Sequence, residues 1–349
     1  EPKLKDFDQD GALCAFIEGI ARPGVTLFLN GDFVDFAQIP PYEVAATPQL
    51  LWGEAASVAK LQAAAQGEAP VASDVIYGAA GAVLALLSLH SVSGDDAALA
   101  AAAQFGRRLL KDAVPCAGGL AWPSHAAATP LLGFAHGTAG VYCALTRLAA
   151  AVTAQGGFGS LAHDCLRAAA AALVHERAHF DKTEQNWPDL RCGTESARFM
   201  RTWCHGAPGV LLSRVAAHAK APGAAATPLA MPPAVVDEIE AAVRTTLSTE
   251  AAEHSLCHGE VGNLLIVAQA AAVLQRRTWQ EQLQARLHRL LLSLNAAPPR
   301  CGFAFPDAAP SLMTGMSGVG YGLLSLAGAP GEFPNVLALA PPLAKKRLT

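Results

Sequence analysis

Two short Cys-His-Gly stretches, at residues 204–206 and 257–259, carry the residue types in this sequence that are best suited to chemistry. Each stretch stands directly before an apolar run of helical composition. A third stretch, at residues 135–137, reads Ala-His-Gly and has the histidine without the cysteine. Cysteine sulfurs and histidine nitrogens are ligands that zinc commonly takes in proteins. The pattern therefore indicates a zinc site to which separate parts of the chain contribute.

The ligand set indicates which chemistry such a zinc would perform. Cys204, Cys257 and His258 offer two thiolates and one imidazole. Three protein ligands leave a fourth position open, which is typical of a catalytic rather than a structural zinc. Two cysteine sulfurs make the zinc a weaker Lewis acid toward water and leave a bound thiolate nucleophilic. The set favours S-alkylation of a thiol over hydrolysis, and the alternative is that these cysteines precede helices by coincidence.

The same context recurs along the chain, which predicts a repeated structural unit. A Gly-x-x-Gly pattern opens an apolar helical run at Gly78, Gly137, Gly206, Gly259 and Gly315. The first four runs are followed by amphipathic helical stretches at residues 95–110, 161–178, 233–248 and 278–294. Internal repetition of this kind is typical of architectures in which neighbouring units bury each other's apolar faces.

The repeats predict an all-α fold, an α/α toroid. Helices that are apolar on every side belong in an inner ring, and amphipathic helices belong outside it with one face in water. We expect the loops before the inner helices to line one polar cavity, with glycines that allow close approach and a positive φ. Ser73 or Asp74 is a suitable cap for the first inner helix. Residues 115–123 are expected to form a loop, and residues 10–20 and 50–65 further helices.

The composition excludes several other classes of protein. Hydrophobic residues make up 52% of the chain and charged residues only 15%, so most of it must pack inward. The net charge of −4 and the lack of a Lys/Arg stripe argue against nucleic-acid binding, and no uninterrupted apolar stretch is long enough for a membrane span. The remaining cysteines have no regular spacing, so we interpret them as small buried side chains in a reducing, cytoplasmic protein. They are Cys14, Cys116, Cys143, Cys165, Cys192 and Cys301.

Together, these motifs resemble those of the lanthionine synthetase C-like cyclases. The resemblance is carried by Gly-Phe-Ala-His-Gly-Thr-Ala-Gly at 133–140, Asn-Trp-Pro-Asp at 186–189, Trp-Cys-His-Gly-Ala-Pro-Gly at 203–209, Cys-His-Gly at 257–259 and Met-Thr-Gly-Met-Ser-Gly-Val-Gly-Tyr-Gly-Leu-Leu at 313–324. It covers about residues 70–340 and is greatest to the C-terminal cyclase domain of class II lanthipeptide synthetases. It implies a single domain, residues 1–349, with seven inner and seven outer helices, in which residues 1–70 supply additional helix pairs and an irregular segment.

The resemblance also implies an activity and a cofactor. A cysteine thiol of a precursor peptide would add to a dehydroalanine or dehydrobutyrine of the same peptide and form a lanthionine or methyllanthionine thioether ring. Cys204, Cys257 and His258 would hold the zinc (Zn²⁺), whose open position would take the substrate thiolate. The implied partners are the dehydrated precursor peptide and a dehydratase domain N-terminal to this segment.

Three further residues receive catalytic roles from the resemblance. His136 matches the family's active-site histidine, which can exchange protons with substrate near neutral pH. Asp74 matches the aspartate that would orient His136, and otherwise it is a plain helix cap. His205 stands where simpler members carry tyrosine after the metal-binding cysteine, so it is either a second proton donor or part of the cavity wall.

One position departs from the family pattern, and two other functions stay open. The family's cavity arginine corresponds to Met200 here, and Arg198 and Arg201 are the nearby candidates to replace it. The first alternative is a non-catalytic zinc protein that binds thiols or peptides. The second is another zinc toroid that alkylates thiols, of the prenyltransferase type, which the aromatic content of 6% disfavours.

Overall fold

The computed structural model describes residues 71–124, 127, 129–193, 198–219, 230–301, 311–328 and 333–340. The helices expected at residues 10–20 and 50–65, and with them the additional pairs assigned to residues 1–70, lie outside the described residues. Nothing tests the single-domain assignment, which stays a prediction.

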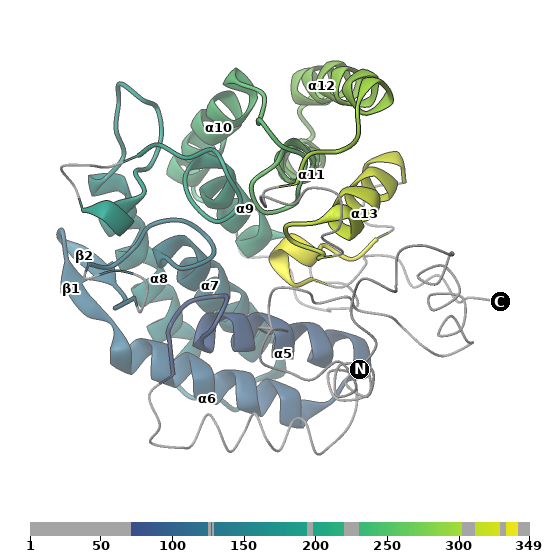
Figure 1. Cartoon of the computed structure of the whole chain (residues 1–349). Coiled ribbons are helices and arrows are strands. Elements are labelled where there is room, and N and C mark those ends of the chain that lie inside the picture. Colours follow the sequence, from purple (N-terminus) through teal and green to yellow (C-terminus); the bar gives the residue numbers. More distant parts are fainter. Residues whose placement is uncertain are drawn as a thin grey trace, which may run out of the picture.

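Two kinds of helix alternate along the described part of the chain, as the repeats predict. The inner helices are α5 (Ala79–Ser93), α7 (Thr138–Gln155), α9 (Ala207–His218), α11 (Glu260–Val273) and α13 (Met316–Ala327). The outer helices are α6 (Asp96–Asp112), α8 (Leu161–Ala178), α10 (Pro233–Ser248) and α12 (Arg277–Ala296). Each of the first four inner helices contacts the next inner helix and the outer helix that follows it, so the pairs succeed one another around an arc (Figure 1).

The all-α toroidal arrangement is confirmed, and the inner helices α7, α9 and α11 are more completely buried than the outer helices, whereas α13 buries only Gly318, Val319 and Gly322. Every residue of α9 is buried, because neighbours surround this helix on all sides. The outer helix α10 buries one stripe that includes Val235, Ile239 and Ala242, and it leaves its other face in water. The apolar core therefore lies between the inner and outer helices. In the described residues, no helix is both long enough and apolar enough to cross a membrane.

The loops that precede the five inner helices differ from the sequence prediction in two respects. Helix α5 has Gly78 as its N-cap residue, so neither Ser73 nor Asp74 caps it. The Asp74 side chain instead accepts a hydrogen bond from the backbone N–H of Tyr77 at 2.7 Å, within the preceding turn. Among the five N-cap glycines only Gly206 has a positive φ, of 85°. The expectation of positive φ at these glycines is therefore wrong for the others.

Close approach of backbone is the reason that the second glycine of each pair is required. A Cβ atom on Gly262 would lie 1.9 Å from the carbonyl oxygen of Leu256. The same clash with the carbonyl six residues earlier recurs at the other four helices, at Gly81, Gly140, Gly209 and Gly318. The contact is made by the loop that leads into each helix, because this loop folds back against the first helical turn.

A short hairpin stands where the sequence indicated only a loop. Strand β1 (Val114–Cys116) pairs antiparallel with β2 (Gly119–Ala121). The two turn residues, Ala117 and Gly118, have φ values of 47° and 78°, and positive φ at both central residues matches the twist of a two-residue hairpin. The hairpin packs against α8, and its strands are too short to show an alternating pattern.

A buried ionic network ties three helices together. Arg214 of α9 has a fully buried side chain and donates to Glu176 of α8 at 2.5 Å and to Glu238 of α10 at 2.8 Å. Arg177 also pairs with Glu238. The Arg214 guanidinium lies 4.9 Å from the centre of the Tyr142 ring. Because charge is costly to bury without a partner, these side chains depend on one another.

The C-terminal segment bonds back to distant inner helices. It contains the short 3₁₀ helix η4 (Val336–Ala338). Its carbonyl groups accept hydrogen bonds from the side chains of Ser88 in α5, Arg147 in α7 and Trp203 before α9. The Arg147 and Trp203 bonds measure 3.1 and 3.0 Å. One short stretch of chain thus joins three repeat units.

We expect Gly262→Ala to destabilise the fold, because its new methyl group would meet the Leu256 carbonyl oxygen. Relieving such a clash by backbone movement costs about 1–3 kcal/mol. The matched control is Gly320→Ala in α13, where nothing lies within 4 Å of the new Cβ and the loss of glycine flexibility stabilises a helix by about 0.5–1 kcal/mol. Urea unfolding followed by circular dichroism measures both, and equal midpoints would contradict the close-approach explanation.

We expect Arg214→Met to lower the free energy of unfolding by about 3–5 kcal/mol, since it leaves Glu176 buried without its cation. The control is Arg277→Met, which removes an exposed ion pair with Glu281 and should change stability by less than about 0.5 kcal/mol. Thermal unfolding of both variants measures the difference. A loss for Arg214→Met no greater than that of the control would show that the network is dispensable.

Candidate metal centre

Backbone hydrogen bonds link the five loops that precede the inner helices, and these loops are termed the inner loops below. Each bond joins one inner loop to the next around the ring. They run from Val75 N to Ala135 O (3.0 Å), from Ala135 N to Cys204 O (3.4 Å), from Trp203 N to Cys257 O (2.9 Å) and from Cys257 N to Met313 O (2.8 Å). Side chains that are far apart in the sequence are thereby brought to one end of the inner helices.

Equivalent positions in these loops carry the polar side chains. The residue directly before the N-cap glycine is Tyr77, His136, His205, His258 or Thr314. Because the loops share a conformation at the glycine contact, residues at this position stand at the same end of the ring. The repetition in the sequence thus has a direct counterpart in space.

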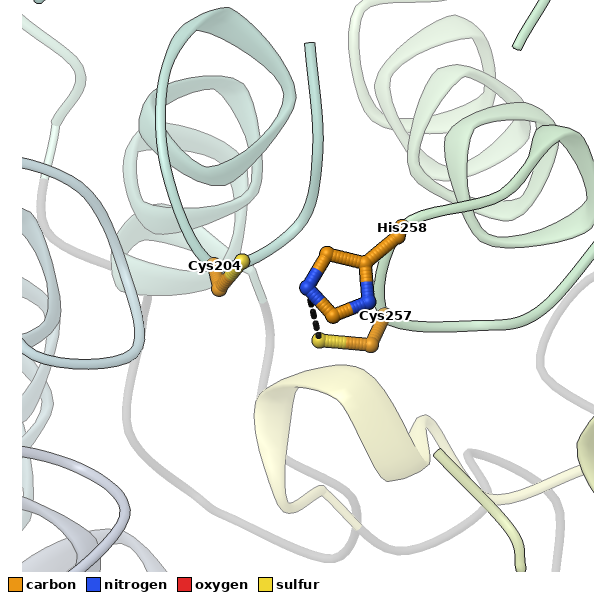
Figure 2. Close-up of side chains that lie close together, drawn as sticks. All are labelled: Cys204, Cys257 and His258. Atoms are coloured by element: carbon orange, nitrogen blue, oxygen red, sulfur yellow. Dashed lines mark hydrogen bonds between the residues drawn. The ribbon is translucent and has the colours of Figure 1, made fainter. Parts of the chain in front are cut away.

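The three predicted metal ligands meet at one point (Figure 2). The sulfurs of Cys204 and Cys257 and a ring nitrogen of His258 all lie within 4.8 Å of one another. Cys204 comes from the loop before α9, and the other two come from the loop before α11. Both cysteines are buried, whereas the His258 side chain is 42% exposed. Over the described ranges, no other group of three such side chains could hold a metal ion.

The electrostatics of the cluster suit a cation. A hydrogen bond with Cys257, assisted by His258, lowers the pKa of the Cys204 thiol well below its ordinary value and outweighs burial, which would raise it. The hydrogen bond with Cys204 raises the pKa of His258. Thiolate character is therefore favoured at Cys204. Two sulfurs and one imidazole facing a common point fit the donor set of Zn²⁺, whose binding would release the remaining protons.

The loop that carries Cys204 is fixed from a distance by Asn186. The Asn186 amide oxygen accepts a hydrogen bond from the backbone N–H of Ala207 at 2.7 Å, at the start of α9. Its amide nitrogen donates to the carbonyl of Met200 at 2.9 Å. Asn186 thus forms hydrogen bonds with backbone groups at both ends of the loop, which Gly206 cannot do because it has no side chain. This explains structurally why the Asn-Trp-Pro-Asp motif accompanies the Cys-His-Gly motif.

His136 and Asp74 form the pair that the sequence resemblance implies. Asp74 Oδ2 lies 2.8 Å from Nδ1 of His136, and the Asp74 carboxylate is buried. Its other oxygen is held by the backbone of Tyr77. The His136 ring lies 6.2 Å from the ring of His205, which is the neighbour of Cys204 in sequence. The pair therefore lies beside the metal-ligand cluster, and the catalytic roles of its members stay predictions.

His205 is buried beside the cluster. Its side chain is 2% exposed, and neither ring nitrogen has a hydrogen-bond partner in the described residues. Burial lowers the pKa of His205, and the positive charge of Arg191 acts in the same direction. The nearest carboxylate oxygen recorded for it belongs to Asp189, at 3.9 Å from Nδ1.

Arg198 and Arg201 are the candidates to replace the family's cavity arginine, which corresponds to Met200 here, and their surroundings differ. Arg198 is exposed. Arg201 has a buried Nε atom without a hydrogen-bond partner among the described residues. Arg191, which sequence reasoning missed, binds Asp189 at 2.6 Å and acts electrostatically on His205.

Tyr77 is a second residue that sequence reasoning missed. Its ring is stacked on that of His136, with centres 5.8 Å apart and an interplanar angle of 27°. It is 65% exposed, which is high for a large aromatic side chain. The signal was available, because Tyr77 precedes an N-cap glycine as His136 does.

The remaining cysteines of the described residues behave largely as expected. Cys143, Cys165 and Cys301 are buried, and Cys116 of the hairpin is partly exposed. Burial raises the pKa of Cys143 to about 11 and of Cys165 to about 12, so both are unreactive thiols. The expectation for Cys14 lies outside the described residues.

Comparisons with known proteins agree with this geometry. The family model described as "Lanthionine synthetase C-like protein" matches residues 51–338, well over half of the chain. Among solved structures, one described as "Nisin cyclase" is similar with a TM-score of 0.57 and 16% sequence identity, over 96% of this chain and 88% of that chain. At this identity the likeness shows a shared fold. A search of curated proteins finds no match. On the extent of the family match, the chain belongs to the lanthionine synthetase C-like family.

Proposed function

We propose that this protein is a zinc-dependent peptide cyclase that forms lanthionine and methyllanthionine rings. The observation that carries the proposal is the convergence of Cys204, Cys257 and His258 beside the His136–Asp74 pair. The substrate would be a dehydrated precursor peptide with free cysteines. A dehydratase domain, of the kind found in class II synthetases, would supply that substrate.

The metal-ligand cluster would bind the nucleophile. Cys204, Cys257 and His258 would hold Zn²⁺ and, as only three ligands, leave room for a substrate sulfur. When bound, zinc supplies Lewis acidity that favours the deprotonated form of a peptide thiol near neutral pH. The buried positions of both cysteines exclude water from the sulfur side of the site. This supports thiol addition rather than hydrolysis.

His136 would move the protons. Because Asp74 occupies Nδ1, Nε2 is the ring nitrogen that remains for substrate. It would take the proton of the attacking thiol, while the sulfur forms a bond to the β-carbon of the dehydro residue. The carbon–carbon double bond then becomes an enolate, and the same imidazole returns a proton to the α-carbon. No net proton is gained or lost.

His205 remains a proposed second proton donor. His205 directly follows Cys204 in the sequence, and its buried ring lies 6.2 Å from the ring of His136. Its ring nitrogens have no partner in the described part of the chain, so a substrate group could provide one. The carboxylate of Asp189 would stabilise the positive charge that develops when the His205 ring takes up a proton, and the charge of Arg191 would favour its release.

Two alternatives are less well supported. A prenyltransferase-type site would need an aspartate among the metal ligands, and the metal-binding cluster found in the described residues contains none. A non-catalytic zinc protein would not require an oriented histidine next to the cluster. The Asp74–His136 pair therefore favours the cyclase.

Metal content tests the first half of the proposal. We expect the wild-type protein to bind one zinc ion per chain and Cys204→Ala to lose it, because only two ligands remain. Cys116→Ala, which alters a cysteine of the hairpin away from the inner loops, should keep its zinc. Elemental analysis after dialysis measures all three. A zinc content that is unchanged in Cys204→Ala would place the metal elsewhere.

Turnover tests the second half. We expect His136→Asn to keep zinc but to form thioether rings about 10²–10⁴-fold more slowly, since the variant loses general acid–base catalysis. The assay follows loss of free thiol in a dehydrated, cysteine-containing peptide. His163→Asn, on the exposed face of α8, serves as the control. If His136→Asn cyclises the peptide at the wild-type rate, the proposed proton transfer is wrong.

A further inference from the structure

We infer that Glu253 is a positioning residue for the metal ligand His258, which it holds through Nδ1 so that Nε2 faces the two sulfurs. The inference rests on the proposed zinc site and adds a residue to it.

The two nitrogens of His258 face different surroundings. Nε2 lies 3.7 Å from the sulfur of Cys257, as the dashed line in Figure 2 marks. Nδ1 lies 3.9 Å from Oε1 of Glu253. The ring therefore presents one nitrogen to the sulfurs and the other to a carboxylate. A metal-binding histidine commonly donates its second ring N–H to a carboxylate, which fixes the ring orientation and raises the basicity of the ligand.

Glu253 belongs to the same tightly bonded loop as His258. The hydroxyl of Ser255 donates to Oε1 of Glu253 at 2.8 Å and accepts from the backbone N–H of His258 at 3.2 Å. The carbonyl of Glu253 accepts from the backbone N–H of Glu260 at 2.8 Å, at the start of α11. Ser255 thus bridges the Glu253 carboxylate and the backbone of His258, so the loop holds the two residues side by side.

The second carboxylate oxygen of Glu253 has no evident structural use. Oε2 is buried and has no hydrogen-bond partner among the described residues. A buried acceptor without a partner is expensive to maintain. The Glu253 side chain is only 16% exposed, so solvent does not offset that cost fully. The present separation of 3.9 Å between Oε1 and Nδ1 is too long for a hydrogen bond, so we expect the carboxylate to move toward Nδ1 when the metal site is occupied.

Neighbouring glutamates are already engaged by arginines. Glu260 binds Arg286 at 2.6 Å, and Glu250 binds Arg289 at 2.6 Å. Glu253 makes no ion pair with an arginine or lysine in the described part of the chain, and the ring nitrogen recorded nearest to its carboxylate is Nδ1 of His258. Of the three glutamates around this loop, Glu253 is thus the one placed to act on the metal ligand.

The affinity for zinc tests the inference without any peptide substrate. We expect Glu253→Gln to bind zinc about 10–100-fold more weakly than wild type, since loss of such a carboxylate typically has this effect. Glu253→Asp should recover part of the loss. Glu250→Gln, which removes an exposed carboxylate of the same charge, should match wild type. Competition against a chromogenic chelator measures the affinities, and circular dichroism checks the fold.

A second readout separates positioning from a general loss of stability. In the cobalt-loaded protein, the sulfur-to-cobalt charge-transfer band should remain in Glu253→Gln because both cysteines are intact. The ligand-field bands should shift, because the imidazole of His258 would no longer be held in the same orientation. Wild-type affinity and unshifted bands in Glu253→Gln would overturn the inference and leave the zinc site standing. Absence of zinc binding by the wild-type protein would overturn both.

Discussion

The chain of backbone hydrogen bonds between successive inner loops is the constraint on which the site depends. Each bond joins a loop to the next one along the ring, and the carbonyl groups of Ala135, Cys204 and Cys257 serve as acceptors. Each of these residues immediately precedes a histidine of the site, which is His136, His205 or His258, respectively. The distances between the functional side chains are therefore set by main-chain geometry, which is stiffer than side-chain packing. The side chains of the site are therefore held in place by the fold itself.

The glycine contacts make this framework possible. Because each loop folds back against its own helix, the residue at the contact can carry no Cβ atom, as at Gly262. The last residue of each loop before the N-cap glycine then lies at the same end of the ring. In the loop that carries Cys204, the hydrogen bonds of Asn186 also hold the backbone in place. In this loop Gly206 has the only positive φ among the five N-cap glycines.

Much of this arrangement could be predicted from the sequence, because periodic glycines and apolar runs are local signals. The helices at 161–178 and 233–248 begin and end at the predicted residues, and the three predicted zinc ligands meet in space. What escaped prediction depends on how the loops fold, which no periodic pattern reports. Asp74 looked like a helix cap because caps and hydrogen-bonded turns use the same residue types. Glu253 and Arg191 carry no motif, and only the folded loops show what they face.

The fastening of the C-terminal segment has a consequence for how the chain folds. The acceptors in residues 337–339 are reached by donors that precede them by 134 to 251 positions. While a ribosome is still making the chain, α5 and α7 can pair with their outer helices, but the donors of Ser88, Arg147 and Trp203 stay unmatched. Closure must follow synthesis of nearly all the described residues, and contacts of such long range form slowly. Until then water satisfies these donors, and the apolar surface that Leu337 and Ala338 will cover stays exposed, as in aggregation-prone folding intermediates.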